Sequence, residues 1–325
     1  MESVSIVIVN FNGKGHLINC LESIRAQTYR NLEVIVVDNG SCDGSQELLR
    51  ANYPDVKLIS NRANHLFCIA QNQGIRASKG QYILSLNNDV ILDSTFVEKL
   101  VEAASLDEMI GIVSGKVLSM NGSVIDSTGQ FPGRSKKPIE RGYKEADIGQ
   151  YEKEGYVFGA GGVAPFYRRQ MLEDIRINGE FFDESYGIFY EDLDISWRAN
   201  LYGWRGFYAP RAIAYHQRGG TVKLETKKPG LLESYNFPYL PRPLKAHLIK
   251  NRYLTMLKNA SIKEIIVDLP YIILYDLKLW GYILFFTPYL ILDTIRNVRY
   301  IRDALIKRKI IQQRRLNKVA NFKFQ

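Results

Sequence analysis

Signals for several large enzyme classes are missing from the chain. Its three cysteines, Cys20, Cys42 and Cys68, are widely spaced and form neither a CxxC pair nor a zinc-ligand spacing. No GxGxxG follows the first strand-like run, and neither GxxxxGKS nor GxxxxGKT occurs, which disfavours a dinucleotide oxidoreductase and a P-loop NTPase. We therefore expect a reduced cytosolic protein without a disulfide framework.

Long apolar runs are also scarce. The longest uncharged stretch of the apolar C-terminal region, 279–292, has 14 residues, whereas a membrane-spanning helix needs about 20. Charged residues and prolines are expected to interrupt the surrounding segments: Asp268, Pro270, Asp276, Lys278, Pro288 and Asp293. The N-terminus enters a strand-like run without a basic start or a cleavage site, so no signal peptide is expected.

The net charge of +9 is concentrated near the C-terminus. Residues 296–318 hold nine Lys or Arg against one Asp, and the first 290 residues are close to neutral. A tail this basic binds anionic lipid or nucleic acid, and no nucleic-acid-binding fold signature accompanies it. We predict helices lying in an anionic membrane interface, with Trp280 at headgroup depth. The alternative is packing on the rest of the chain or on a second subunit of a homodimer.

The first 118 residues alternate strand-like and helix-like patterns. Apolar runs rich in β-branched residues are typical of buried parallel strands, and they lie at 4–9, 32–37, 56–59, 82–86 and 110–118. Segments with apolar residues at helical spacing separate them. This order predicts an α/β fold with a mostly parallel sheet flanked by helices.

The rest of the chain is less regular. Residues 121–155, rich in Gly, Lys, Glu and Ser, are predicted to be surface loops or a flap. Further strands are expected at 158–167, 204–208 and 212–215, and a helix at 190–201. Composition then shifts, so we predict one domain over 1–240, with halves of about 1–118 and 119–240, and a C-terminal helical region over 241–325.

Polar side chains follow three of the predicted strands. Asn10 and Asn12 follow the first, Asp38 the second, and Asn88 with Asp89 the fourth. Carboxyl ends of parallel strands meet at one edge, where ligands bind in open α/β sheets. A lone carboxylate there suits a divalent cation that keeps waters and takes substrate phosphates as ligands. The structural alternatives are a turn before a capped helix and, for Asp38, satisfaction of the adjacent turn amides.

Two further places hold candidate functional residues. Glu191, Asp192 and Asp194 crowd the start of the predicted helix 190–201; the helix dipole explains one or two acids, and Asp194 pairs with Arg198 at i, i+4. Asp192 is left as a candidate general base. His216 ends the last predicted strand before Arg218, Gly219 and Gly220, where a neutral imidazole would complete a metal site. A structural or merely exposed histidine is the alternative.

Five stretches together resemble a known family. They are SIVIVNFNG, LESIRAQTYRNLEVIVVDNGSCDGS, YILSLNND, FGAGGVAPFYRR and FYEDLDISWRANLYGWRGFYAPRAIAYHQRGG, in family order over about residues 3–220. They resemble the inverting nucleotide-sugar glycosyltransferases of family 2, which have the Rossmann-like GT-A fold, and within them the rhamnosyltransferase-like branch of cell-surface polysaccharide assembly.

The resemblance implies a reaction. A sugar would move from a dTDP- or UDP-linked donor, with dTDP-rhamnose the first expectation, to a lipid-linked or polysaccharide acceptor at the inner face of the cell membrane. Galactosyl, galactofuranosyl, glucosyl or N-acetylhexosaminyl transfer is the alternative. Asp89 would hold Mg²⁺ or Mn²⁺ on the donor diphosphate, and His216 would contact the metal or the pyrophosphate. Asp192 would be the catalytic base, with Gly161 and Glu191 as candidates for the acceptor site.

The resemblance also assigns donor contacts. Asp38 would bind the pyrimidine base, and the other donor contacts would be Asn10, Asn12, Asn64, Asn72 and Asn88. Two departures from the family stand out: the triplet 87–89 has a single carboxylate, and Leu66 stands where many relatives carry glycine.

Two other classes of function were weighed. A nucleotidyltransferase needs a glycine-rich loop that cradles an NTP, and residues 12–15, NGKG, are a poor one. A non-catalytic protein that binds a sugar nucleotide or a membrane is disfavoured because Asp38, Asp89 and Asp192 occur together.

Overall fold

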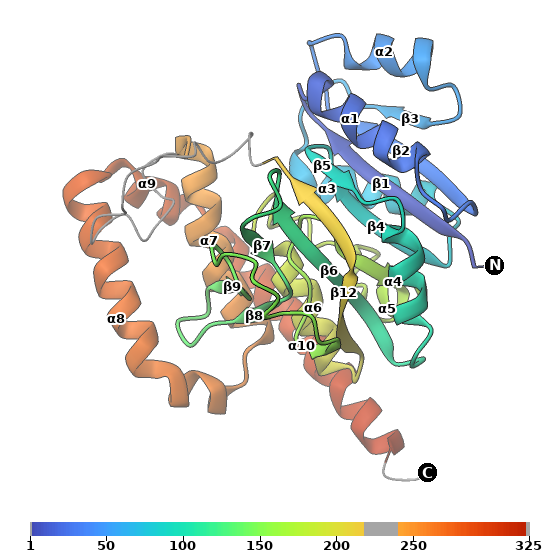
Figure 1. Ribbon diagram of the computed structural model, residues 1–325. Helices are drawn as coiled ribbons and strands as arrows, with labels where there is room; N and C mark the ends of the chain where they lie inside the picture. Colours follow the sequence, from blue (N-terminus) through green and yellow to red (C-terminus); the bar gives the residue numbers. More distant parts are fainter. Residues whose placement is uncertain (1, 218–239, 323–325) are drawn as a thin grey trace. The chain divides into compact units, whose positions relative to one another are not determined.

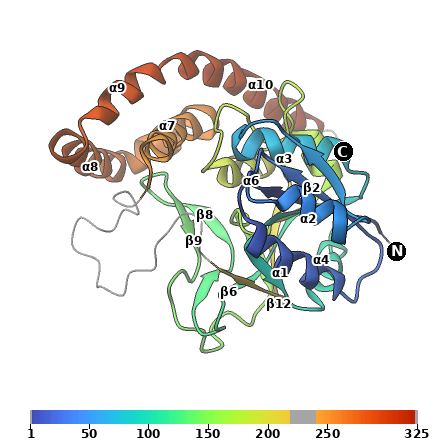
Figure 2. The ribbon, with the colours of Figure 1, turned by 90° about the horizontal axis from the view of Figure 1, so that it is seen from above.

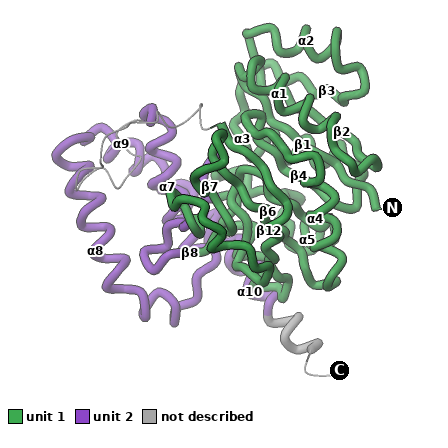
Figure 3. Tube along the Cα trace, viewed as in Figure 1, with its two compact units in different colours: residues 1–131, 140–187, 191–217 green, residues 132–139, 188–190, 218–325 purple. Residues whose placement is uncertain are grey.

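The computed structural model describes residues 2–217 and 240–322 and divides the chain into two compact units (Figure 3). Unit 1 comprises Met1–Phe131, Glu140–Gly187 and Glu191–Gln217. Unit 2 comprises Pro132–Ile139, Ile188–Tyr190 and Arg218–Gln325. The predicted boundary at residue 240 adjoins residues outside the described part, and so it stays a prediction.

The N-terminal half of the unit 1 sheet is parallel, as predicted (Figure 1). Its strands are β1 (Val4–Asn10), β2 (Leu32–Asp38), β3 (Lys57–Ser60) and β4 (Tyr82–Asn87), with β1 between β4 and β2. In register, Asn10 lies opposite Asp38, and Val9 lies opposite Asn87. The polar ends of these three strands therefore meet at one edge.

The other half of the sheet is mixed. β6 (Ile110–Ser119) and β12 (Arg205–His216) are parallel, and β11 (Phe166–Arg168) runs antiparallel between β4 and β6. Three short strands pair antiparallel at the margins: β5 (Val90–Leu92), β7 (Ile125–Ser127) and β10 (Gly155–Val157). β8 (Gln130–Pro132) and β9 (Pro138–Glu140) form a separate pair.

Three expected details differ. The segments 204–208 and 212–215 form one strand, β12, whose register shifts between Ala209 and Ile213; this interval contains Pro210, which has no N–H to donate to a ladder. Residues 158–165 lie outside the strands, so only the end of the expected strand 158–167 pairs, as β11. The segment 121–155 is not only loops, because it contains β7, β8 and β9.

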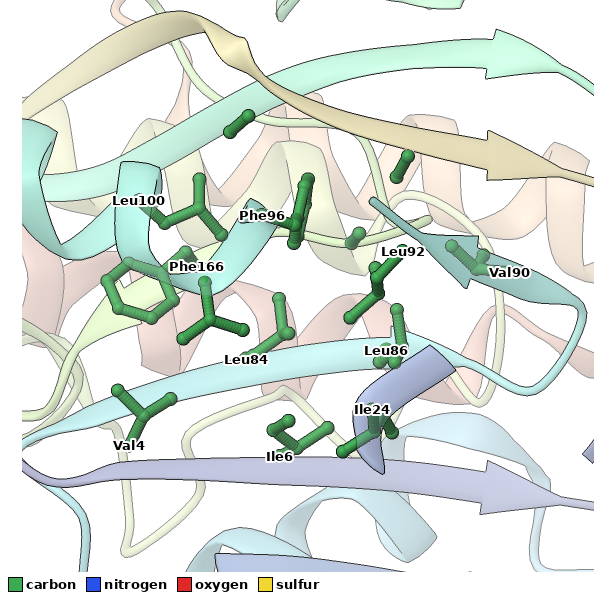
Figure 4. Packing of buried hydrophobic residues seen from close by; sticks show 14 of the residues in the cluster. Val4, Ile6, Ile24, Leu84, Leu86, Val90, Leu92, Phe96, Leu100 and Phe166 are labelled. Atoms are coloured by element: carbon green, nitrogen blue, oxygen red, sulfur yellow. The ribbon is translucent and has the colours of Figure 1, made fainter. Parts of the chain in front are cut away.

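Helices cover both faces of the sheet. They are α1 (Lys14–Arg25), α2 (Ser45–Asn52), α3 (Leu66–Ala77), α4 (Phe96–Ala104), α5 (Arg169–Ile175) and α6 (Glu191–Leu201). On one face, Ile6 and Leu84 pack with Phe96 and Leu100 of α4 (Figure 4). On the other face α3 packs on β1 and β2. Gly74 permits this approach, since a Cβ there would lie 2.2 Å from Cγ1 of Val7.

Unit 2 is built mainly from four helices, α7 (Arg242–Asn259), α8 (Ile262–Phe286), α9 (Tyr289–Arg296) and α10 (Arg299–Phe322). Both α9 and α10 pack on α7 (Figure 2). Its small apolar cluster contains Ile249, Leu279, Ile283 and Leu290. Trp280 packs against this cluster and donates to the Tyr253 hydroxyl at 2.9 Å, and its expected headgroup position stays a prediction. The side chain of Lys318 in the basic tail lies outside the described residues.

α8 corrects one expectation about the apolar region. Pro270 was expected to break it but lies inside a helix of 25 residues. Ser261 and Glu264 form a capping box at its start, which satisfies free backbone amides, and Pro288 does separate α8 from α9. Among the described residues, α8 is the one helix long and apolar enough to cross a membrane, judged by length and composition.

Candidate active site

A row of hydrogen bonds joins the ends of β1, β2 and β4. Asn10 is fully buried; its amide nitrogen donates to Asp38 Oδ2 at 3.0 Å and to Ser41 Oγ at 3.2 Å. Its amide oxygen accepts from Asn88 Nδ2 at 2.8 Å. The structure therefore brings together three predicted donor-site residues from separate parts of the chain.

Asp38 also accepts a hydrogen bond from the adjacent turn, which was the structural alternative for this residue. Its Oδ1 accepts from the backbone N–H of Ser41 at 2.9 Å and from Gln46 Nε2 at 2.8 Å, and the residue is fully buried. Since protein donors already occupy both oxygens, contact with a nucleotide base stays a prediction.

Asn12 and Asn64 hold the loops beside this row. Asn12 Oδ1 accepts from the Cys42 amide at 2.8 Å, and Asn64 Oδ1 accepts from Asn39 Nδ2 at 2.9 Å. Asn39, which the sequence analysis missed, also donates to the Leu66 carbonyl at 3.1 Å. Its only signal was its place beside Asp38 at the end of β2. Leu66 itself has a φ of +65°, a conformation that glycine adopts more readily than residues with a Cβ.

Asn72 is hydrogen-bonded within the fold, away from this row, and the donor contact assigned to it stays a prediction. Its side chain is fully buried, donates to the Phe182 carbonyl at 2.8 Å and accepts from the Phe182 amide at 2.9 Å. A third bond reaches Glu184 at 3.0 Å. These bonds use the amide to tie α3 to the loop around residue 182, which leaves the side chain committed to structure.

His216 lies between two carboxylates. Its Nε2 is 3.3 Å from Asp89 Oδ1, and its Nδ1 is 2.7 Å from Asp126 Oδ2. Burial alone would lower the pKa of His216, but the hydrogen bonds to Asp126 and Asp89 outweigh burial and raise it to about 9. Without a bound metal, His216 therefore holds a proton at neutral pH, and the neutral imidazole of a metal-bound site stays a prediction. Arg218, Gly219 and Gly220, which suggested a ligand role, lie outside the described residues.

The Asp89 corner fits a divalent cation held mainly by its substrate. Within residues 2–217 and 240–322, no group of three or more His, Cys, Asp or Glu side chains is arranged to hold a metal ion. Asp89 and His216 together offer one carboxylate and one imidazole. Mg²⁺ commonly binds one or two carboxylates plus substrate phosphates and water, so an open corner of this kind fits a cation that arrives with a diphosphate.

A second cluster surrounds Asp192 at the start of α6. Its Oδ2 accepts from the Gly162 amide at 2.8 Å and from Gln130 Nε2 at 2.7 Å. Its Oδ1 accepts from the Leu193 amide at 2.7 Å. Burial raises the pKa of Asp192 above its usual range, although these hydrogen bonds act in the opposite direction.

Two more carboxyl groups belong to this cluster. Burial and the charge of Asp192 raise the pKa of Glu140 to about 7, and the same two causes raise the pKa of Glu191 to about 8. Glu140 accepts from Ser127 and from Gln130. A Cβ on Gly161 would lie 2.5 Å from the Glu140 carboxylate, so glycine lets this loop approach the acidic cluster.

The sequence analysis missed Asp126, Gln130 and Glu140 because it assigned residues 121–155 to loops. β7 links the two clusters, since Asp126 contacts His216 and the next residue, Ser127, donates to Glu140. The sequence offered one indication of these three residues, namely polar side chains in a region without helical or strand periodicity.

The remaining acid of α6 is structural, as predicted. Arg198 Nε lies 2.9 Å from Asp194 Oδ2, and both side chains are 1% exposed. Arg198 also donates to the Ile175 and Phe181 carbonyls. This network anchors α6 and leaves Asp192 as the acid turned to the polar cluster.

The backbone just before α6 is strained. Phe189 and Tyr190 have φ values of +72° and +70°, which cost roughly 1–3 kcal/mol each for residues with a Cβ. Asn251 of α7 holds the preceding segment by donating to the Ile188 and Phe189 carbonyls at 2.8 Å each. Strained backbone of this kind is retained where it sets the direction of the residues that follow, which here are the first residues of α6.

A family model described as "Glycosyl transferase family 2" matches residues 5–176. The chain belongs to this family. This confirms the predicted resemblance, and the matched region includes the strand-end row, Asp89, Glu140 and Gly162. Glu191, Asp192 and His216 follow the matched region in the chain.

Two curated members of family 2 are similar over two thirds of this chain. An N-acetylglucosaminyl-diphospho-decaprenol L-rhamnosyltransferase of Mycobacterium tuberculosis is 26% identical over 239 residues, which is 66% of this chain and 75% of that protein. A poly-beta-1,6-N-acetyl-D-glucosamine synthase of Staphylococcus epidermidis is 23% identical over 222 residues, 66% of this chain and 50% of that protein.

A solved structure shares the fold. The crystal structure of GalNAc-T7 with UDP, GalNAc and Mn²⁺ superposes with a TM-score of 0.58 at 16% identity, and it covers 79% of this chain. The chain spans 48% of the length of that structure. The GT-A expectation for the fold is thereby confirmed.

Proposed function

We propose that this family 2 protein is a metal-dependent inverting glycosyltransferase that moves a sugar from a nucleotide-sugar donor to a lipid-linked acceptor. The observation that carries the proposal is the buried Asp192 carboxylate, held by three N–H donors in the same unit as the strand-end row and the Asp89 corner. dTDP-rhamnose is the preferred donor because a relative is named as an L-rhamnosyltransferase. UDP-sugars are the alternative, supported by the synthase and by the UDP-bound GalNAc-T7 structure.

Asp192 acts as the general base in this proposal. An acceptor hydroxyl is a weak nucleophile until its proton is removed, and a positioned carboxylate contributes typically about 10²–10⁴-fold to the rate. Burial raises the pKa of Asp192, which strengthens it as a base. Gln130 and Gly162 hold one of its oxygens, so its direction is set before substrate binds. Attack opposite the leaving diphosphate inverts the anomeric configuration.

The Asp89 corner serves the leaving group. Mg²⁺ or Mn²⁺ bound there by Asp89 and His216 would neutralise charge on the diphosphate. Before a metal binds, the His216 ring contacts both carboxylates beside it. Asn10, Asp38 and Asn88 line the adjacent nucleotide side as one hydrogen-bonded row.

The sharpest test of the donor is nucleotide release from a panel of dTDP- and UDP-sugars, with Mg²⁺, Mn²⁺ or EDTA. Many transferases hydrolyse their donor slowly without an acceptor, so the acceptor need not be known. We expect release from dTDP-rhamnose to exceed release from the other donors and to stop in EDTA. Equal release with and without a divalent cation would refute the metal dependence.

We also propose that unit 2 seats the enzyme on the anionic inner face of the cell membrane. Ile266, Leu274 and Leu277 of α8 are 64%, 54% and 68% exposed. Acidic residues of the same helix are paired inside the unit: Asp268 with Lys136 and Arg134, and Asp276 with Arg252. An exposed apolar face, on a helix whose acidic side chains are paired within the protein, is typical of an interfacial helix.

Flotation with liposomes tests this seating. The full chain is expected to float with vesicles rich in phosphatidylglycerol and less with neutral vesicles, because basic residues near a surface contribute about 1 kcal/mol each. The double variant Leu274→Ser, Leu277→Ser should float less than a control with Leu106→Ser, an exposed leucine of unit 1. Failure of the wild-type chain to float with either vesicle would refute membrane seating.

A further inference from the structure

A basic pocket lies within unit 2, among α7, α9 and the start of α10. Its volume is about 340 Å³. The charged and titratable residues that line it are Arg242, His247, Lys250, Asp293, Arg296 and Arg299. Four of these side chains are permanent cations at neutral pH, and one is a carboxylate.

Contacts with neighbouring side chains hold three of the four cations, although Arg242, Arg296 and Arg299 are exposed. Arg242 is fixed by two bonds to Asp293, at 2.8 and 3.0 Å. Lys250 is buried, with its Nζ 4.5 Å from the centre of the Tyr300 ring, and the Arg299 guanidinium lies 4.9 Å from the same ring. Gathering charges of one sign in a small space raises the free energy of the pocket, and a bound anion lowers it again.

Apolar side chains adjoin the pocket residues along the chain. Leu292, Ile295 and Val298 are 59%, 61% and 56% exposed, and they alternate with Asp293, Arg296, Asn297 and Arg299 of the pocket lining. Phe285 and Phe286, at the end of α8, are 78% and 61% exposed. A ligand that satisfies both features is an amphiphile with an anionic head and a hydrocarbon chain.

We propose that this pocket binds the diphosphate head of the lipid-linked substrate, with the hydrocarbon chain along Leu292, Ile295 and Val298. The proposal rests on the proposed function, which supplies a lipid-linked acceptor. A diphosphate diester carries two adjacent negative charges, which match the excess of cations better than the single charge of a phospholipid phosphodiester. Arginine also pairs with phosphate through two parallel hydrogen bonds.

Binding of farnesyl diphosphate to the full-length protein in a neutral detergent tests the proposal. The double variant Arg296→Gln, Arg299→Gln should bind at least about tenfold more weakly, since it loses charge-assisted hydrogen bonds to the phosphates. The control Arg302→Gln removes an exposed charge of α10 that does not line the pocket and should bind like wild type. Equal affinity of the double variant and the control overturns the proposal.

Two comparison ligands identify the source of the phosphate. Farnesol should bind no more tightly to wild type than to the double variant, because it lacks the charged head. Vesicles of phosphatidylglycerol should compete with farnesyl diphosphate poorly. If they compete as well as unlabelled farnesyl diphosphate does, and the double variant stops binding them, the pocket is a phospholipid headgroup site and the diphosphate assignment is overturned.

Donor hydrolysis separates this proposal from the proposed function. Nucleotide release without an acceptor does not involve the pocket, so the double variant should release nucleotide at the wild-type rate. Loss of farnesyl diphosphate binding with normal nucleotide release supports the pocket assignment. Absence of release from every donor in the wild-type protein would instead refute the proposed function, whatever the lipid affinities are.

Discussion

Unit 1 holds two clusters of buried titratable side chains, and the two clusters bring together different kinds of charge. At the Asp89 corner, one imidazolium lies between two carboxylates, and the pKa of His216 rises to about 9. Around Asp192, three carboxyl groups gather, and the pKa values of Glu140 and Glu191 rise to about 7 and 8. A metal cation bound at the corner would displace the proton of His216. In the Asp192 cluster, by contrast, the raised pKa values favour the protonated carboxyl groups.

This difference matches the two tasks of a glycosyl transfer. A leaving diphosphate needs positive charge, and the corner offers carboxylates that attract a cation. An acceptor hydroxyl needs a proton acceptor, and burial among other carboxyl groups makes Asp192 a stronger base than an exposed aspartate. Three of the four predictions that follow change one cluster at a time, and the fourth concerns Leu66; they run from the largest expected effect to the smallest.

Asp192→Asn should lower sugar transfer by about 10²–10⁴-fold, because the amide cannot accept the hydroxyl proton. Nucleotide binding should be retained, since Asp192 is not part of the strand-end row. Transfer and nucleotide affinity would be measured on the same preparations, with Glu173→Gln as a surface control in α5. Transfer near the wild-type rate would show that the base is another residue.

Asp89→Ala should abolish the metal-stimulated part of transfer, because Asp89 is the only carboxylate of the triplet 87–89. Asn88→Ala should act more mildly, since Asn88 contributes one hydrogen bond to Asn10. The measurement is transfer rate against Mn²⁺ concentration. If both variants keep the wild-type metal response, the cation binds away from this corner.

Glu140→Gln should stabilise unit 1 at high pH and not at low pH. The pKa of Glu140 is about 7 in the folded chain against 4.5 for an ordinary glutamate. Its protonated form is favoured by folding, so this contribution to stability is fully present below pH 4.5 and is lost as pH rises through 7. The gain at pH 8 is on the order of 3 kcal/mol.

Urea unfolding at pH 4 and pH 8 measures this effect. Glu145→Gln, at an exposed position in the same region, is the matched control and should change stability little at either pH. A Glu140→Gln variant that is equally stable relative to wild type at both pH values would contradict the interpretation of the acidic cluster.

Leu66→Gly should lower the free energy of unfolding only slightly, although removal of a leucine side chain usually lowers it more. Leu66 has a φ of +65°, so glycine relieves roughly 1–2 kcal/mol of backbone strain while it loses a partly buried side chain. Leu48→Gly in α2 also loses a partly buried leucine but gains no such relief, and glycine in a helix interior costs about 1 kcal/mol more than alanine. Equal losses of unfolding free energy at the two positions would contradict this account of Leu66.

Much of unit 1 could be predicted from the sequence because its signals are local. β-branched runs predicted β1, β2 and β4, and the strand ends brought Asn10, Asp38 and Asn88 together as expected. The Asp194–Arg198 pair followed from i, i+4 spacing. Three partners of the proposed chemistry could not be predicted in this way: Asp126, Gln130 and Glu140 lie on short strands, and each contacts its partner across the fold.

The sequence by itself determined the alternating α/β pattern, the polar strand ends, the acidic start of α6 and the basic C-terminal region. Hydrophobic periodicity and residue spacing over short segments of the chain are enough to recognise these features. Only the tertiary structure decided that Asn72 bonds to the loop around residue 182, that His216 lies between Asp89 and Asp126, and that Glu140 joins Asp192. Hydrogen-bond partners and pKa values depend on burial and on charges far away in sequence, and folding alone brings these together.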